Sequence, residues 1–511
     1  MQDKVIVTYK AALVSKYGAA GSKAVHGALT TLVAADKKRG LTSRIVYLDD
    51  AAAMKQIGAP TVTNNRNQRE TKQAIDAIYK KLKPDYLLII GANDVVSHQF
   101  LTNPALSAGD DNEFAFGDIA YACDEPYGKD PAKFIGPTRV VSRLPDLEGA
   151  SEPSHLLALL KTAAQWKSRK IDDYKNYFGL SAATWQVSTE MSLENIFGQG
   201  KTVLAPPKKP PHSPKSLSAL MHFVNCHGDT GKPEFYGESS SDQPVSLTTK
   251  SLKGRIKAGT IASVECCFGA ELYNSFILDE DIPICQTYLR QGAYGYFGST
   301  TISYGPADSN GAADLICQYF LRNILGGASI GRAALMARQQ FVAKVQQMDA
   351  MDLKTLAQFC LYGDPSIHPI LEVKSKALPK NGNAAAADRF LRSEIRAKLK
   401  ETGEFLRKSK PTASKRATRQ SSTPKEKAVL AKIAAEGGLK GKQTFVAYQV
   451  KGAPPVQKAK KGMKKVASAP SRYFLTIGVP AARKDKLGRK VAIVAKEVQG
   501  KIVDYRIYHE R

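Results

Sequence analysis

The sequence of 511 residues contains no apolar stretch of the length that a membrane-spanning helix needs, and no phosphate-binding loop of the form Gly-x4-Gly-Lys-Ser/Thr. These two absences argue against an integral membrane protein and against a nucleotide hydrolase. The 7 cysteines are odd in number and scattered, so they do not form the disulfide framework of a small secreted protein. The N-terminal residues 1–7 also lack the apolar core of a signal peptide, which predicts a cytoplasmic protein or a mature form whose leader has been removed.

Positive charge is abundant but concentrated at one end of the chain. The net charge is +27, and residues 377–511 hold 33 basic and 10 acidic side chains, a net +23. The first 376 residues are close to neutral, at +4. A tail of this kind attracts nucleic acid or an acidic protein, so we expect such a partner for residues 377–511 and no membrane. A solubilising linker would have the same composition.

Strands and helices alternate through the first three-quarters of the chain, and this alternation predicts an α/β fold with a mostly parallel sheet covered by helices on both faces. The expected strands are residues 5–9, 44–49, 86–91, 139–142 and 293–298, and the expected helices are 22–38, 68–82, 153–168, 311–325 and 332–348.

The last part of the chain has a different pattern. Residues 384–408 are helix-prone, and residues 410–427 have the composition of a disordered segment. Four alternating stretches at 443–450, 472–479, 490–498 and 501–508 predict antiparallel strands. The expected divisions are an N-terminal α/β subdomain (1–150), a catalytic subdomain (151–376), a basic helical or disordered linker (377–436) and a small basic β-rich module (437–511).

Two apolar runs each end at reactive side chains. The run 219–224 is followed by Asn225, Cys226, His227 and Gly228, and the run 259–264 by Glu265, Cys266 and Cys267. Buried parallel strands read as continuous apolar runs, and chemistry in open α/β sheets gathers at their carboxyl ends. The sequence therefore predicts that His227 and Cys267 meet at one edge of the sheet, as a cysteine nucleophile and its base.

Six short motifs occur in the order found in one peptidase family, and together they extend over the first three-quarters of the chain. They are the strand 86–91 followed by Asp94, residues 141–145 (Val-Ser-Arg-Leu-Pro), the strand that ends at His227-Gly228, the strand that ends at Cys267, residues 296–300 (Tyr-Phe-Gly-Ser-Thr) and residues 363–366 (Gly-Asp-Pro-Ser). In these motifs the chain resembles the gingipain-type cysteine peptidases of the caspase-like (clan CD) superfamily, as a cytosolic bacterial relative. The resemblance implies a caspase-like three-layer α/β/α body in two subdomains.

The resemblance also implies a mechanism. Cys267 would attack the scissile carbonyl, with His227 as its partner in a catalytic dyad, and the backbone N–H groups of Gly228 and Cys267 would form the oxyanion hole. Cys267 is favoured over the adjacent Cys266 because the reactive thiol is expected at the exposed end of the strand. A third, acidic member is not evident, although Thr184 lies near its place in relatives.

The family's specificity pocket corresponds to Asn225, Glu265 and Tyr304, and an upstream acidic residue of the arginine-specific relatives would fall near Glu190. An acidic pocket favours Arg or Lys at the cleaved bond. Glu265 is the stronger candidate because an acid at the end of a buried strand needs a partner. Glu190 is equally well interpreted as a surface acid in the first turn of a helix.

Alternatives to this interpretation remain open. Cys226, His227, Cys266 and Cys267 could be zinc ligands, although adjacent pairs fit zinc spacing poorly. The body could also be an inactive caspase-like scaffold that binds nucleic acid or an acidic partner through its tail. For a peptidase we expect a protein or peptide substrate, self-processing in the lysine-rich segments 201–215 and 408–427, and no cofactor apart from an allowance for structural calcium.

Overall fold

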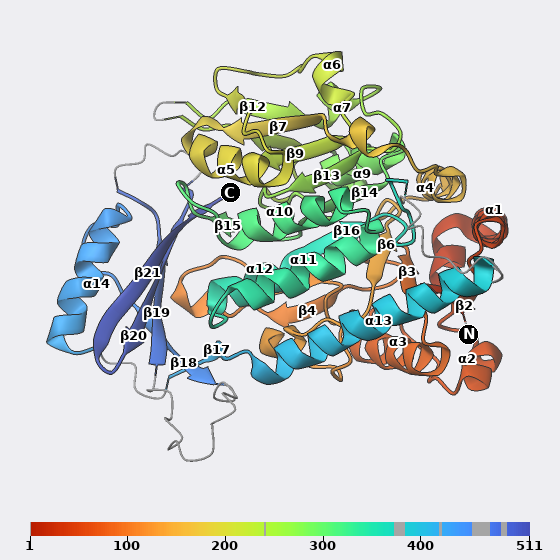
Figure 1. Ribbon diagram of the computed structural model, residues 1–511, viewed down its shortest axis with the longest axis horizontal. Coiled ribbons are helices and arrows are strands. Elements are labelled where there is room, and N and C mark those ends of the chain that lie inside the picture. Colours follow the sequence, from red (N-terminus) through yellow and green to blue (C-terminus); the bar gives the residue numbers. More distant parts are fainter. Residues whose placement is uncertain (1, 240–241, 372–383, 418–421, 452–470, 482–487) are drawn as a thin grey trace.

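A central sheet of ten strands organises the first three-quarters of the protein (Figure 1). A computed structural model describes residues 2–511 except 240–241, 372–383, 418–421, 452–470 and 482–487. In spatial order, the strands are β2 (Ser43–Tyr47), β1 (Lys4–Thr8), β3 (Tyr86–Ile90), β6 (Val141–Leu144), β16 (Phe359–Tyr362), β14 (Gly295–Ser299), β13 (Ile261–Val264), β9 (Met221–Asn225), β7 (Tyr177–Ala182) and β8 (Val203–Ala205).

The sheet is parallel except where β16 runs antiparallel to β14. Its central strands are fully buried, as their continuous apolar sequences require. The predicted α/β class and the mostly parallel sheet are therefore confirmed. Both expected subdomains contribute strands to this one sheet, and they join where β6 pairs with β16.

Helices cover both faces of the sheet (Figure 1). On one face α1 packs on α4 and α4 on α9; on the other, α10 packs on α5 and α11, and α11 on α13. The helices are α1 (Lys10–Lys38), α2 (Ala51–Ile57), α3 (Gln68–Leu82), α4 (Ser154–Gln165), α5 (Gln186–Phe197), α6 (Pro214–Leu217), α7 (Thr249–Leu252), α8 (Ser275–Leu278), α9 (Ile284–Arg290), α10 (Ala312–Leu325), α11 (Ile330–Lys344), α12 (Ala350–Gln358), α13 (Ala384–Ser409) and α14 (Pro424–Glu436). No helix in the described part of the chain is both long and apolar enough to cross a membrane.

Most predicted elements match the structure closely, with one clear difference at the start of the chain. The helix at 68–82 has the predicted bounds, because Asn67 caps its first turn through Arg69 N and Glu70 N. The helix predicted from residue 22 instead begins at Lys10, with a break at Gly18, where φ is 69°. The glycines at 18 and 21 obscured the first turns in the sequence pattern.

A second sheet contains the C-terminal strands and one short strand of the catalytic region. Its order is β15 (Tyr304–Gly305), β21 (Lys501–Glu510), β20 (Val491–Val498), β19 (Ser471–Gly478), β18 (Val446–Lys451) and β17 (Thr412–Arg416). Two smaller sheets pair β4 (Gln99–Thr102) with β5 (Phe114–Gly117), and β10 (His227–Gly228) with β11 (Glu234–Tyr236) and β12 (Val245–Thr248). All four predicted C-terminal strands are present.

The boundary predicted for the linker differs from the structure. The segment 377–436 contains α13, the edge strand β17 and the helix α14. Leu430 and Ile433 of α14 pack on the C-terminal sheet, so an apolar stripe that the basic composition concealed gives this segment its structure. The C-terminal sheet therefore begins near residue 412, and β15 makes it continuous with the catalytic region.

Ion pairs attach the basic part of the chain to individual acidic side chains of the body. In α13, Arg396 lies 2.9 Å from Asp85 and Arg407 lies 2.9 Å from Glu125. In the C-terminal sheet, Arg506 lies 3.4 Å from Asp349, and Lys490 pairs with Asp111. Part of the charge in the tail is thus neutralised inside the molecule.

Arg143, in the motif at 141–145, links three segments of the N-terminal half. Its guanidinium is fully buried, pairs with Asp118 at 2.6 Å and donates to the main-chain oxygens of Gly91 and Val96. A buried ion pair of this kind is costly to break, because the remaining charge is left without a partner.

We therefore expect Arg143→Met to lower the free energy of unfolding by about 3–5 kcal/mol. Urea denaturation followed by circular dichroism measures this change, and the exposed Arg290→Met at the end of α9 is the matched control. Equal midpoints for the two variants would contradict a structural role for Arg143.

Candidate functional site

The two reactive strand ends are neighbours at the carboxyl edge of the central sheet. β9 and β13 pair in parallel, with Val224 opposite Val264, so the residues that follow both strands leave the sheet side by side. Gly228 lies against the Cys267 loop so closely that a Cβ at Gly228 would approach the main-chain oxygen of Cys267 to 1.8 Å. Only glycine fits this position, which explains why a glycine follows His227.

His227 is held by groups from two other segments. Its Nε2 lies 3.0 Å from Oε2 of Glu238, and the ring of Trp185 packs edge-on at 4.3 Å between ring centroids. Thr184 donates to the same Glu238 oxygen at 3.0 Å. The acid that the sequence did not identify is therefore Glu238. It lies in a long polar loop, where no spacing rule links it to His227, and Thr184 contacts the acid rather than replacing it.

Cys267 is fully buried, whereas the sequence predicted an exposed thiol. Its Sγ accepts a hydrogen bond from Ser303 N at 3.2 Å and lies 3.4 Å from Ser303 O. The pKa of the Cys267 thiol is raised to about 12, mainly by burial and also by Glu510, while Arg489 opposes the shift. The cause of the burial is the C-terminal sheet, whose side chains pack around Cys267. The neighbouring Cys226 and Cys266 are also buried.

The main chain of Arg511 lies directly over this pair. Its oxygen accepts hydrogen bonds from Cys267 N at 3.2 Å and Gly228 N at 3.4 Å, and its own N–H donates to Ser303 O at 3.0 Å. Immediately before it, β21 pairs antiparallel with β15, with Glu510 opposite Tyr304 and His509 opposite Gly305. The chain therefore crosses the sheet edge as an added strand that ends at the reactive residues. In Figure 1 the C-terminus lies among β15, α5 and α10.

The Arg511 side chain fills a closed pocket behind the reactive pair and is fully buried. Its guanidinium lies 3.1 Å from the Asp314 carboxylate, 2.6 Å from Pro306 O and 3.5 Å from Ser188 Oγ, and it stacks 4.4 Å from the ring of Trp185. Asp314 lies in the first turn of α10, and Ser188 belongs to α5. The pocket thus matches the charge, the hydrogen-bonding groups and the flat shape of a guanidinium.

Glu265 lies beside Asp314 at the base of this pocket. Burial raises the pKa of Glu265 well above its usual range, and the Asp314 carboxylate raises it further, whereas Arg511 lowers it. Burial also raises the pKa of Asp314, while Arg511 and a hydrogen bond from Glu265 lower it. Glu265 is therefore the protonated member of the pair, and Asp314 carries the charge that faces the guanidinium.

Of the other three predicted pocket residues, two lie at the site and one lies outside it. Tyr304 lies on the strand that holds β21, and Asn225 is buried and donates to Thr189 Oγ1 at 3.0 Å on α5. Glu190 is not in the pocket: it accepts a hydrogen bond from Gln186, one turn earlier on the outer side of α5. The acid that contacts the guanidinium is Asp314, whose position at a helix start gave no sequence signal for a pocket.

The four residues considered as alternative zinc ligands are not assembled as a metal site. In the described residues, the one group of side chains close enough to hold a metal is His98, Asp118 and Cys360, in the buried interior. Asp118 already binds the guanidinium of Arg143. Cys226, His227, Cys266 and Cys267 form no such group.

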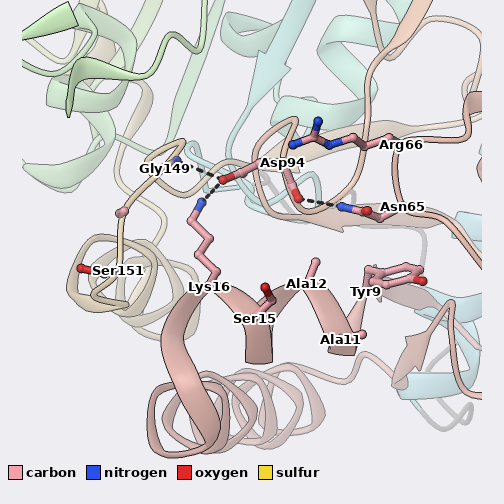
Figure 2. Close-up of a pocket in the computed structure, with 11 residues that line it drawn as sticks. Tyr9, Ala11, Ala12, Ser15, Lys16, Asn65, Arg66, Asp94, Gly149 and Ser151 are labelled. Carbon is pink, nitrogen blue, oxygen red and sulfur yellow. Dashed lines mark hydrogen bonds and ion pairs between the residues drawn. The ribbon is translucent and has the colours of Figure 1, made fainter. Parts of the chain in front are cut away.

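A separate cavity of about 550 Å³ lies at the start of α1, in the N-terminal half of the sheet (Figure 2). Asp94, from one of the six motifs, lines it and binds Lys16 Nζ at 2.7 Å and Gly149 N at 3.0 Å. Figure 2 shows these three groups converging at one side of the cavity. Because the Asp94 carboxylate is paired there, this motif supports the local loops and contributes nothing to the reactive pair.

One comparison with known proteins covers part of this site. Residues 231–370 match the sequence model of peptidase family C25, a region that begins just after His227 and includes Cys267 and Asp314. No curated protein sequence matches the chain. A solved structure titled "Structure of Protease" is similar at 15% identity and a TM-score of 0.41, covering 99% of this chain and 96% of that one. Residues 231–370 are therefore similar to a cysteine peptidase family, and the protein is a cysteine peptidase.

Proposed function

We propose that the protein is an endopeptidase that cleaves its substrates after arginine, with Cys267 as the nucleophile and His227 as its acid–base partner. The observation that carries this proposal is the position of Arg511. Its main-chain oxygen accepts hydrogen bonds from the N–H groups of Gly228 and Cys267, which follow β9 and β13, while its guanidinium lies against Asp314. A peptide substrate bound in the same way would present the main-chain carbonyl of an arginine to Cys267.

The chemistry follows from this placement. Cys267 Sγ attacks the scissile carbonyl carbon, and the developing oxyanion is stabilised by the N–H groups of Gly228 and Cys267. The thiol proton passes to His227, which donates a proton to the leaving amine as the C–N bond breaks and a thioester forms. Water then hydrolyses the thioester, which releases the carboxylate product and restores the thiol.

Arginine fits the pocket better than lysine. A guanidinium is planar, so it can stack on Trp185 while its N–H groups bind Asp314 and Pro306 O. A lysine ammonium is a point charge on a narrower stem and would lose the stacking. We therefore infer a preference for arginine, with Asp314 as its main determinant and Glu265 as a protonated support. Self-processing in segments 201–215 and 408–427 stays a prediction. The first segment contains lysine but no arginine, and the second contains both.

The first prediction separates the two adjacent thiols. Cys267→Ala should abolish hydrolysis of a peptide that ends in arginyl-aminomethylcoumarin, and Cys266→Ala should retain it, because Cys266 contributes only a buried side chain to the core. Both variants are assayed in the chain that also carries Arg511→Ala, so that the pocket is open. Retained hydrolysis in Cys267→Ala would refute the assignment of the nucleophile.

The second prediction concerns specificity. Asp314→Asn removes the charge that faces the guanidinium, and we expect kcat/KM for arginyl substrates to fall about 100-fold, with a smaller change for a glutaminyl substrate. The matched control is Asp308→Asn, an exposed acid in the loop before α10. If Asp314→Asn and Asp308→Asn gave the same ratio of arginyl to glutaminyl hydrolysis, Asp314 would not determine specificity.

The third prediction concerns Glu238 as a positioning residue for His227. Glu238→Gln preserves the shape of the side chain but removes the carboxylate that orients the imidazole, so we expect kcat to fall about 10-fold while KM changes little. Glu234→Gln, on the neighbouring β11, is the matched control. A change in KM alone would indicate an effect on substrate binding rather than on His227.

A further inference from the structure

Residues 509–511 occupy the position that a substrate needs. We define residues 509–511 as the plug. The plug adds to β15 as a strand, its last main-chain oxygen fills the oxyanion position, and its last side chain fills the arginine pocket. A substrate cannot enter while these three places are occupied.

The plug is held by a folded part of the protein. β21 pairs along its length with β20, and Arg489 and Lys490 come immediately before β20. Arg489 donates to Gly228 O at 2.8 Å, and Lys490 N donates to the Glu510 carboxylate at 2.8 Å. Further along the same sheet, Tyr448 donates to Pro104 O in the body at 2.7 Å. These contacts hold the plug in the cleft through the folded sheet.

Tethering makes such a segment effective even when its contacts alone would be weak. A flexibly linked ligand has an effective concentration in the millimolar range, and a preorganised one avoids much of the ordering cost as well. A free peptide substrate must compete with this local concentration.

The plug also explains the state of the thiol. Cys267 is fully buried, and Ser303 N donates to its Sγ. The surrounding C-terminal residues keep water away from the sulfur, and burial raises its pKa to about 12. A thiol in this environment remains protonated at neutral pH and is a poor nucleophile.

We propose that residues 509–511 act in cis as a substrate-like inhibitor, and that the C-terminal sheet keeps them over Cys267 until it is displaced. As an inhibitor of peptide hydrolysis, the plug rests on the proposed function; as a cover for the thiol, it can be tested without any enzymatic activity.

The test compares the full chain with Arg511→Ala, which empties the arginine pocket. The matched control is Lys501→Ala, an exposed cation at the other end of β21. Iodoacetamide alkylation of Cys267 at neutral pH, followed by mass spectrometry of its peptide, should be at least about 10-fold faster in Arg511→Ala than in the wild type or Lys501→Ala. Circular dichroism establishes that the variants are folded.

A peptide addition makes the test specific. A synthetic peptide with the sequence of residues 503–511 should restore protection of Cys267 in Arg511→Ala, whereas the same peptide ending in alanine should not. Equal alkylation rates in the wild type and Arg511→Ala, or a Cys267 in the wild type that reacts as fast as free cysteine, would overturn the proposal.

Hydrolysis of an arginyl-aminomethylcoumarin peptide distinguishes this proposal from the proposed function. We expect a rise of at least about 10-fold in Arg511→Ala. Faster alkylation without any hydrolysis would leave the plug as a cover and refute the endopeptidase. Equal hydrolysis and equal alkylation in both chains would refute the plug and support the endopeptidase.

Discussion

The pairing of a buried guanidinium with a carboxylate joins the C-terminal sheet to the catalytic region. Arg511 is fully buried, and a charge in that position is tolerated only with a partner of opposite sign and further hydrogen bonds. Asp314, Pro306 O and Ser188 provide them, from the start of α10, the loop after β15 and helix α5. Three elements that are distant in the sequence are thereby organised around one side chain.

The same pairing determines how two adjacent buried acids coexist. If Glu265 and Asp314 were both ionised, two like charges would face a single cation in a closed space. The raised pKa of Glu265 removes this conflict, because a protonated Glu265 leaves one charge for one guanidinium. The pocket is therefore balanced for a single positive charge.

The sequence predicted those parts of the structure that depend on local patterns. Apolar runs located the central strands, and their parallel order brought His227 and Cys267 to one edge, as β9 and β13 do. The sequence could not identify Glu238 or Asp314, because their contacts depend on loops and helix starts with no fixed spacing from the strands. Glu190 was misplaced for a related reason: a helix turns its side chains through 3.6 residues, so Ser188 points toward Arg511 while Glu190, two residues later, points outward.

The basic tail shows most clearly what composition can and cannot predict. Its excess of lysine and arginine predicted a partner of negative charge, and in the described residues individual acidic side chains of the body are such partners: Asp85, Glu125 and Asp111 each hold a cation from residues 384–511. Partly exposed ion pairs, such as those of Arg407 with Glu125 and Lys490 with Asp111, contribute little individually and weaken in salt, whereas the buried contact between Arg511 and Asp314 is screened much less. The tail is thus held by many weak contacts along its length and by one strong contact at its end.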